Sequence, residues 1–171
     1  MMENRAVIAR RRISDQVSAA APRMRITKCI GHRWDDLFNL VLDVESYAAF
    51  VPHCRKVRLL SRRAASPTHT VIVSRMTVGL AGLEVSYANR TNADAATRLI
   101  EVEAIDGPLR YLRAVWRFIP RGEQRTEIDF SVDFEFNSLV LAAVASRVFG
   151  SMFGEMVDAF ERRADRRFPR R

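Results

Sequence analysis

The histidines and cysteines are the residues of this chain best suited to nucleophilic or metal chemistry. His53 and Cys54 stand side by side, and a thiol activated by an imidazole is a strong nucleophile. Adjacent residues seldom bring their side chains into contact, however, so this pair is a poor indicator of catalysis. His32, His53 and His69 are scattered, and the adjacent His53–Cys54 pair lacks the C-x-x-C or H-x-x-x-H spacing with which two ligands face one ion. Nothing in the spacing of Cys29 and Cys54 indicates a disulfide. We therefore predict no metal site and two reduced, structural cysteines.

The acidic residues show no catalytic arrangement either. Glu101 and Glu103 alternate with Ile100 and Val102, which is typical of a solvated strand face. Asp43 follows a helical pattern, and we expect it to form hydrogen bonds at the helix end or in the loop. The chain has no glycine-rich phosphate loop and no G-x-S-x-G motif. We therefore predict no catalytic residues and a protein that is not an enzyme.

A different kind of site is predicted by YAAFVPHC, residues 47–54, which we call the lid segment. It joins a helical pattern to a strand pattern, and ordinary connecting loops are polar and rich in glycine. This one has no glycine and contains Tyr47, Phe50, Val51 and Pro52. Such side chains are expected to face an interior, so we predict that these four residues close an apolar cavity.

The positive charge of the chain is concentrated at its two ends. The net charge is +8, of which residues 1–23 contribute +3 and residues 161–171 contribute +4, so that residues 24–160 are nearly neutral. Nucleic-acid affinity depends on neutralising several phosphates, and a neutral body argues against it. We predict no DNA partner. The basic ends are either solvated tails or peripheral contacts with the phosphates of lipid or RNA.

The length suits one domain with tails. We expect residues 1–23 to be a disordered basic extension, residues 24–168 to form the domain, and residues 169–171 to be a basic tail. No apolar run approaches the roughly 18–20 residues that span a bilayer, and no secretory signal is present. We therefore expect a cytoplasmic protein, with the inner membrane as the place of any peripheral contact. In a eukaryote, the extension would pass for a mitochondrial transit peptide.

Residues 127–136 have the clearest structural signal. Their even-numbered positions are apolar and their odd-numbered positions are acidic or polar, which is typical of an antiparallel strand with one buried face. The preceding strand pattern, residues 109–120, places Trp116 and Phe118 on one face and Arg117 on the other. A hairpin between the two strands would stack the aromatic rings on one face and pair arginines with acidic residues on the other.

The end of the chain has the 3.6-residue period of a helix, from Ser138 as a natural N-cap to about Phe168. The whole order is a strand, two short helices, about six strands and this long amphipathic helix. A sheet of about seven antiparallel strands with one apolar face must curl, and only the last helix is long enough to fill its concave side. A curved sheet and a straight helix do not meet along their whole length, so an apolar cavity is expected between them.

Four segments together resemble the START-like polyketide cyclase/dehydrase superfamily, within it the subfamily of coenzyme Q-binding proteins and ribosome-association toxins. They are the DVESYxxFVPxC block, the GPLRYLRAVWRF strand, the FEF strand end and the MFGEMVDAFERRA helix. The resemblance spans residues 24–168 and implies an α+β helix-grip fold. Ala48, His53 and Ala114 depart from the residues usual in the family, at positions that bear on the pocket.

The resemblance implies a polyprenyl quinone, ubiquinone, as a bound ligand rather than a cofactor, and a carrier role in respiration. We predict that the cavity and its lid are formed by Tyr47, Phe50, Val51, Pro52, Trp116, Phe118, Phe130, Met152 and Met156. Apolar side chains with adaptable methionines suit a long hydrophobic ligand, although any one of them could be plain core.

Two alternatives stay open at this point. The resemblance also implies binding to the large ribosomal subunit, which would block subunit joining. The basic residues for that contact would be Arg55, Lys56, Arg58, Arg62 and Arg63, or the tails. The second alternative is a cyclase or another small-molecule enzyme of the superfamily, for which the chain offers no acid–base pair.

Overall fold

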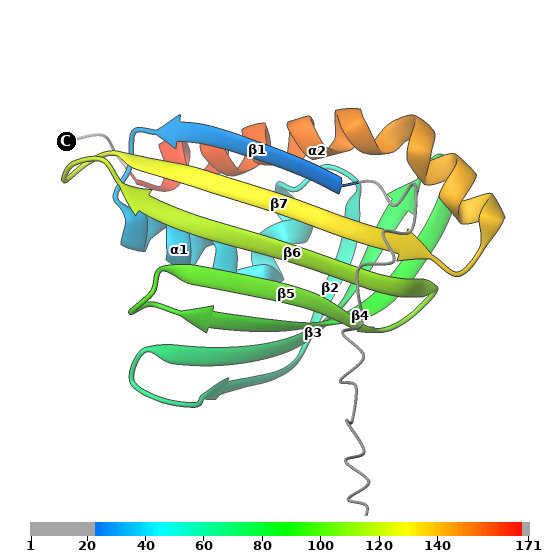
Figure 1. Cartoon of the computed structure of the whole chain (residues 1–171), viewed down its shortest axis with the longest axis horizontal. Coiled ribbons are helices and arrows are strands. Elements are labelled where there is room, and N and C mark those ends of the chain that lie inside the picture. Colours follow the sequence, from blue (N-terminus) through cyan, green and yellow to red (C-terminus); the bar gives the residue numbers. More distant parts are fainter. Residues whose placement is uncertain (1–22, 169–171) are drawn as a thin grey trace, which may run out of the picture.

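The computed structural model describes residues 23–168, in which one curved sheet is accompanied along its length by a long helix (Figure 1). The elements are β1 (Arg23–Ile30), α1 (Trp34–Leu42), η1 (Val44–Ala49), β2 (Cys54–Ala64), β3 (His69–Leu80), β4 (Leu83–Asp94), β5 (Leu99–Asp106), β6 (Leu109–Pro120), β7 (Thr126–Phe136) and α2 (Leu139–Arg167). The predicted N-terminal extension and the predicted tail lie outside the described residues, except that Arg23 already belongs to β1.

The seven strands form one antiparallel sheet in the order β1-β7-β6-β5-β4-β3-β2. The first strand pairs with the last, and every other strand pairs with its neighbour in sequence. This arrangement confirms the predicted helix-grip fold, with α1 and the 3-10 helix η1 as the two short helices after β1. It also leaves β2 as an edge strand.

The hairpin of β6 and β7 has the predicted register. Trp116 lies opposite Phe130, with ring centroids 3.9 Å apart, and Arg117 lies opposite Asp129 on the other face. Arg25 of β1 donates two hydrogen bonds of 2.7 Å to the Asp129 carboxylate. This contact, reinforced by the charge of Arg117, holds the pKa of Asp129 below its usual range.

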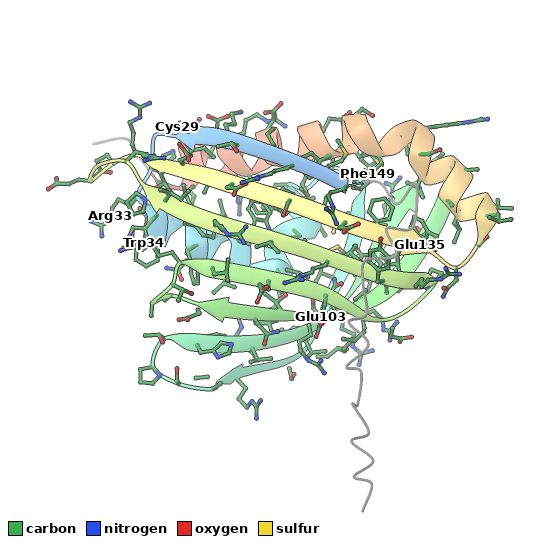
Figure 2. The ribbon with its side chains drawn as sticks, in the orientation of Figure 1. Cys29, Arg33, Trp34, Glu103, Glu135 and Phe149 are labelled. Atoms are coloured by element: carbon green, nitrogen blue, oxygen red, sulfur yellow. The ribbon has the colours of Figure 1, made fainter. Side chains whose placement is uncertain are left out.

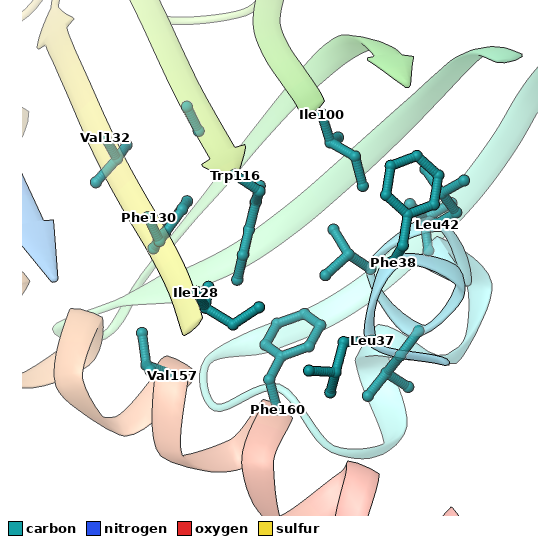
Figure 3. Packing of buried hydrophobic residues seen from close by; sticks show 14 of the residues in the cluster. Leu37, Phe38, Leu42, Ile100, Trp116, Ile128, Phe130, Val132, Val157 and Phe160 are labelled. Carbon is teal, nitrogen blue, oxygen red and sulfur yellow. The ribbon is translucent and has the colours of Figure 1, made fainter. Parts of the chain in front are cut away.

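Helix α2 begins where the N-cap predicts, because the Ser138 side chain accepts a hydrogen bond from the amide of Leu141. Its buried side chains lie mainly in its second half, where the helix packs onto the sheet and α1. Figure 3 shows Val157 and Phe160 of α2 reaching toward the strands. The first half of α2 packs less closely, which leaves space between helix and sheet.

Among the described residues, α2 is the one helix long and apolar enough to cross a membrane by length and composition. The expectation that no apolar run approaches this length was therefore too strict. Residues 139–156 hold only two charged side chains, Arg147 and Glu155. The core helix of a folded domain can meet the same test, but only 17% of the apolar 18-residue stretch is buried here, and the closely packed part of α2 is its second half.

Candidate functional site

A cavity of about 230 Å³ lies between the concave face of the sheet and α2. Its walls are mainly aliphatic and aromatic, because the inner-face residues of the strands and the facing residues of α2 are apolar. Seven of the nine predicted residues line it: Tyr47, Val51, Pro52, Trp116, Phe130, Met152 and Met156. The fold thus brings the lid segment, the β6–β7 hairpin and α2 around one space.

Phe50 and Phe118 do not line the cavity, contrary to the prediction. Phe50 packs beside it, with its ring centroid 5.9 Å from that of Tyr47 and 5.1 Å from that of Phe160. Phe118 lies on the expected face of β6 but near the strand end, where its ring packs 5.4 Å from Phe38 of α1. Because α1 fills the groove there, an inward-facing residue at that end belongs to the solid core.

One wall of the cavity is a stack of aromatic rings. The Phe130 ring lies between Trp116, at 3.9 Å, and Phe153 of α2, at 5.1 Å and nearly parallel to it. Phe149 continues this wall toward the start of α2, with its ring 4.3 Å from Phe134 of β7. Figure 2 shows Phe149 on the side of α2 that faces the sheet. Flat, polarisable surfaces of this kind suit a ligand that contains a ring.

Hydrogen bonds hold the lid segment on three sides. The Tyr47 hydroxyl donates to the backbone carbonyl of Val41, and burial raises the pKa of Tyr47 well above its usual range. The His53 carbonyl accepts a hydrogen bond of 2.8 Å from the amide of Gly79 in β3. The His53 ring Nε2 lies 3.4 Å from the carboxylate of Glu155 in α2. The lid segment is therefore joined both to the sheet and to the helix that it faces.

His53 and Cys54 have separate environments rather than a shared catalytic one. His53 faces Glu155, whereas Cys54 is buried and lines the cavity. Burial raises the pKa of the Cys54 thiol, so the thiol stays protonated and is a poor nucleophile. Cys29 is exposed and neither cysteine forms a disulfide. Within residues 23–168, no group of three or more His, Cys, Asp or Glu side chains is placed to hold a metal ion.

Three polar residues of the cavity wall were missed from the sequence: Ser74 on β3, and Asn89 and Thr91 on β4. All three are buried. The signal was present in LEVSYANRTN, residues 83–92, whose odd-numbered positions share one face of a strand. That face carries Val85 and Tyr87, followed directly by the amide of Asn89 and the hydroxyl of Thr91.

The basic residues of the ribosomal alternative all lie on the exposed edge strand β2: Arg55, Lys56, Arg58, Arg62 and Arg63. Arg62 is committed to the fold, since it donates a hydrogen bond of 2.8 Å to the carbonyl of Leu42. Arg58 lies opposite Arg75 of β3, but Asp106 pairs with Arg75 at 2.5 Å and offsets its charge, so the positive strip is confined to the edge strand. The fold therefore does gather these residues into one basic strip.

Comparison with known proteins places this geometry in a family. The profile of the "Polyketide cyclase / dehydrase and lipid transport" family matches residues 30–161. A protein of Rickettsia prowazekii named "Ribosome association toxin RatA" is 33% identical over 141 residues, which cover 81% of this chain and 92% of that protein. A Xenopus laevis protein named "Coenzyme Q-binding protein COQ10 homolog B, mitochondrial" is 32% identical over 150 residues, which cover 84% of this chain and 58% of that protein.

The fold itself has been seen before. A START superfamily protein from Mycobacterium smegmatis superposes with a TM-score of 0.69 at 17% sequence identity, covering 84% of this chain and 97% of its own. Likeness at this level of identity concerns the fold alone. The names of the two relatives describe binding, to ribosomes in one case and to coenzyme Q in the other, and neither name is that of an enzyme.

Proposed function

This chain belongs to the polyketide cyclase/dehydrase and lipid transport family, as its sequence predicted, and on that premise we propose that it binds a polyprenyl quinone such as ubiquinone. Its role would be that of a lipid carrier or chaperone that supports respiratory electron transport without altering the quinone. The observation that carries this proposal is the apolar cavity, because an unfilled space in a core costs stability and needs a reason.

The size of the cavity bears on how such a ligand would sit. Pockets that enclose drug-sized ligands measure about 300–1,000 Å³, which is more than the space of about 230 Å³ seen here. We therefore place the quinone ring and the first part of its tail inside, with the rest of the tail leaving the protein. Leu139 and Val140, at the start of α2, are 90% and 67% exposed and would ease exchange with a bilayer. The proposed location is thus the cytoplasm, with peripheral contact at the inner membrane.

Native mass spectrometry of the purified protein, with solvent extraction of the same sample, tests the proposal. We expect a bound quinone, and we expect Met152→Trp to exclude it because the larger side chain fills part of the cavity. Ser146→Trp is the matched control, since Ser146 is exposed on the same helix and its hydroxyl donates to the helix carbonyl of Ala143. A wild-type protein that extracts without quinone and takes up none from vesicles would refute the proposal.

A second candidate is favoured by one specific observation, the basic strip along β2. It would bind ribosomal RNA of the large subunit and so block subunit joining, in line with the name of the Rickettsia relative. Binding that neutralises phosphates releases counterions and weakens steeply with salt, whereas retention of an apolar ligand changes little. Sedimentation with large subunits at physiological salt, lost on changing Lys56 and Arg58 to glutamate, would favour this candidate. The quinone content of that double variant should stay at the wild-type level.

A further inference from the structure

Ser74, Asn89 and Thr91 form a polar trio in the otherwise apolar wall of the cavity. Ser74 and Asn89 are direct partners in the β3–β4 ladder, and Thr91 lies on the same face of β4 two residues further on. The exposed fractions of the three residues are 2%, 5% and 4%. Burial of a polar group in apolar surroundings costs stability unless the group forms a hydrogen bond. Each member of the trio therefore needs a partner inside the protein or inside the cavity.

Asn89 lacks such a partner at its amide oxygen, since Oδ1 is buried and makes no hydrogen bond. Within the described part of the chain, the other buried side-chain atom of this kind is Nε of Arg163, whose guanidinium lies over the ring of Phe50. The Tyr87 hydroxyl donates to Sδ of Met76 at 3.5 Å and accepts a hydrogen bond from the Asn89 side chain, which must come from the amide nitrogen because Oδ1 has no partner. Burial raises the pKa of Tyr87 to about 12, so this group stays neutral at physiological pH. The Asn89 oxygen is thus an acceptor in the cavity wall that the protein itself does not satisfy.

We propose that Asn89 is the head-group site of the cavity and that its Oδ1 accepts a hydrogen bond from a ring hydroxyl of the ligand. This inference rests on the proposed function, since it assigns the polar end of a quinone-class ligand. A ubiquinone ring offers only acceptors, its carbonyl and methoxy oxygens, whereas its form reduced by two electrons and two protons, the hydroquinone, offers two hydroxyl donors. An amide oxygen that lacks a donor therefore favours the hydroquinone. The hydroxyls of Ser74 and Thr91 accept or donate and add no preference of their own.

This selectivity would determine where the carrier acts. The protein performs no redox step, because the hydroquinone enters and leaves unchanged. An enzyme that reduces quinones must supply its cargo, and an enzyme that oxidises hydroquinones must consume it. The quinone formed by that enzyme would have no donor for Asn89, so it would bind the carrier less tightly than the hydroquinone and would compete with it poorly.

The test compares three probes of nearly equal size by anaerobic equilibrium dialysis. They are ubiquinone with one isoprene unit, its hydroquinone, and that hydroquinone with both hydroxyls methylated. We expect the wild-type protein to bind the hydroquinone about tenfold more tightly than the other two probes. In Asn89→Leu this difference should disappear, through weaker binding of the hydroquinone alone. The matched control is Asn92→Leu, on the outward face of the same strand, which should leave the preference intact.

Thermal melting of the ligand-free variants separates a binding role from a structural one. Asn89→Leu should melt no lower than the wild type, because it removes an unsatisfied buried group. Equal loss of affinity for all three probes, together with a lower melting temperature, would show that Asn89 is structural and overturn the inference. Equal wild-type affinity for quinone and hydroquinone would overturn the inference and leave the proposed function standing. Failure of the wild type to bind any probe would refute the proposed function, and the inference with it.

Discussion

The two halves of α2 differ in how they are held. In the second half, Val157, Phe160 and Ala164 are buried, and Lys28 of β1 contacts Asp158 and Glu161 at 2.9 and 2.5 Å. Two more contacts join this half to the elements around α1: Arg167 to Asp43 at 2.6 Å, and His32 to Asp165 at 2.8 Å. We call this half of α2, with α1 and the strand ends it covers, the closed end.

The first half of α2 has a different environment. Leu139 and Val140 are exposed, while Phe149 and Met152 are half-buried and line the cavity. Among the described residues, no ion pair joins residues 139–154 to another element. We call this half the open end. The lid segment bridges the two ends, because Val51 and Pro52 line the cavity while Phe50 packs on Phe160 of the second half. The contrast shows that one helix does two tasks, because one half completes the folding core and the other half leaves room for a ligand.

The sharpest test places the same charge at a fully buried position of the cavity wall and in the lid segment. Phe130→Lys should unfold the protein, because Phe130 is 3% exposed between two rings and a buried unpaired charge costs several kcal/mol of a total of about 5–15 kcal/mol. Val51→Lys should fold and lose its ligand, because a lysine at the lid can extend its ammonium to water. Thermal melting and quinone content per mole of protein measure both variants.

The lid interpretation is wrong if Val51→Lys unfolds the protein as severely as Phe130→Lys. In that case the lid segment belongs to the core. If Val51→Lys neither unfolds the protein nor releases quinone, the cavity opens elsewhere.

Truncation of one ring in each region gives the next largest effect. Phe118→Ala at the closed end should cost about 3–5 kcal/mol, because Phe118 is 3% exposed and α1 cannot collapse into the space. Phe149→Ala should cost about 1–2 kcal/mol, because its ring is half-buried beside an existing cavity. Denaturant unfolding measures both changes. Equal costs would mean that the open end is as well packed as the closed end.

This contrast also explains what could be predicted from the sequence. The alternation in β7 and the 3.6-residue period of α2 are local signals, and both elements formed as predicted with the β6–β7 register. The boundary between core and cavity has no local signal in the sequence, because it depends on how far α1 reaches into the groove between sheet and helix. Phe118 was therefore assigned to the cavity on its strand face alone, although it packs on Phe38. Asn89 was missed for the opposite reason, since its neighbours in sequence look like an ordinary polar strand end.

A charged contact at the closed end should give a smaller, pH-dependent effect. Hydrogen bonds to Glu161 and Asp158 raise the pKa of Lys28, so its stabilising contribution is complete below the unfolded value of about 10.4 and is lost as pH rises through the folded value. Lys28→Met should cost about 1 kcal/mol at pH 8, and the difference from wild type should vanish at higher pH. Melting temperatures from pH 8 to 11 measure this. Arg147→Met at the open end is the control and should change the melting temperature little. An equal loss of stability in that variant would mean that ion pairs do not distinguish the closed end from the open end.

The smallest effect is expected where the lid segment meets α2, at the contact of 3.4 Å between His53 and Glu155. Both side chains are more than a third exposed, so their contact is worth less than about 1 kcal/mol and Glu155→Gln should melt like the wild type. If this contact keeps the lid segment closed, Glu155→Gln should nevertheless release its ligand about two- to fivefold faster than the wild type. Stopped-flow transfer of quinone to empty vesicles measures both rates. Identical rates at low salt would mean that the ligand leaves by a path that does not separate the lid segment from α2.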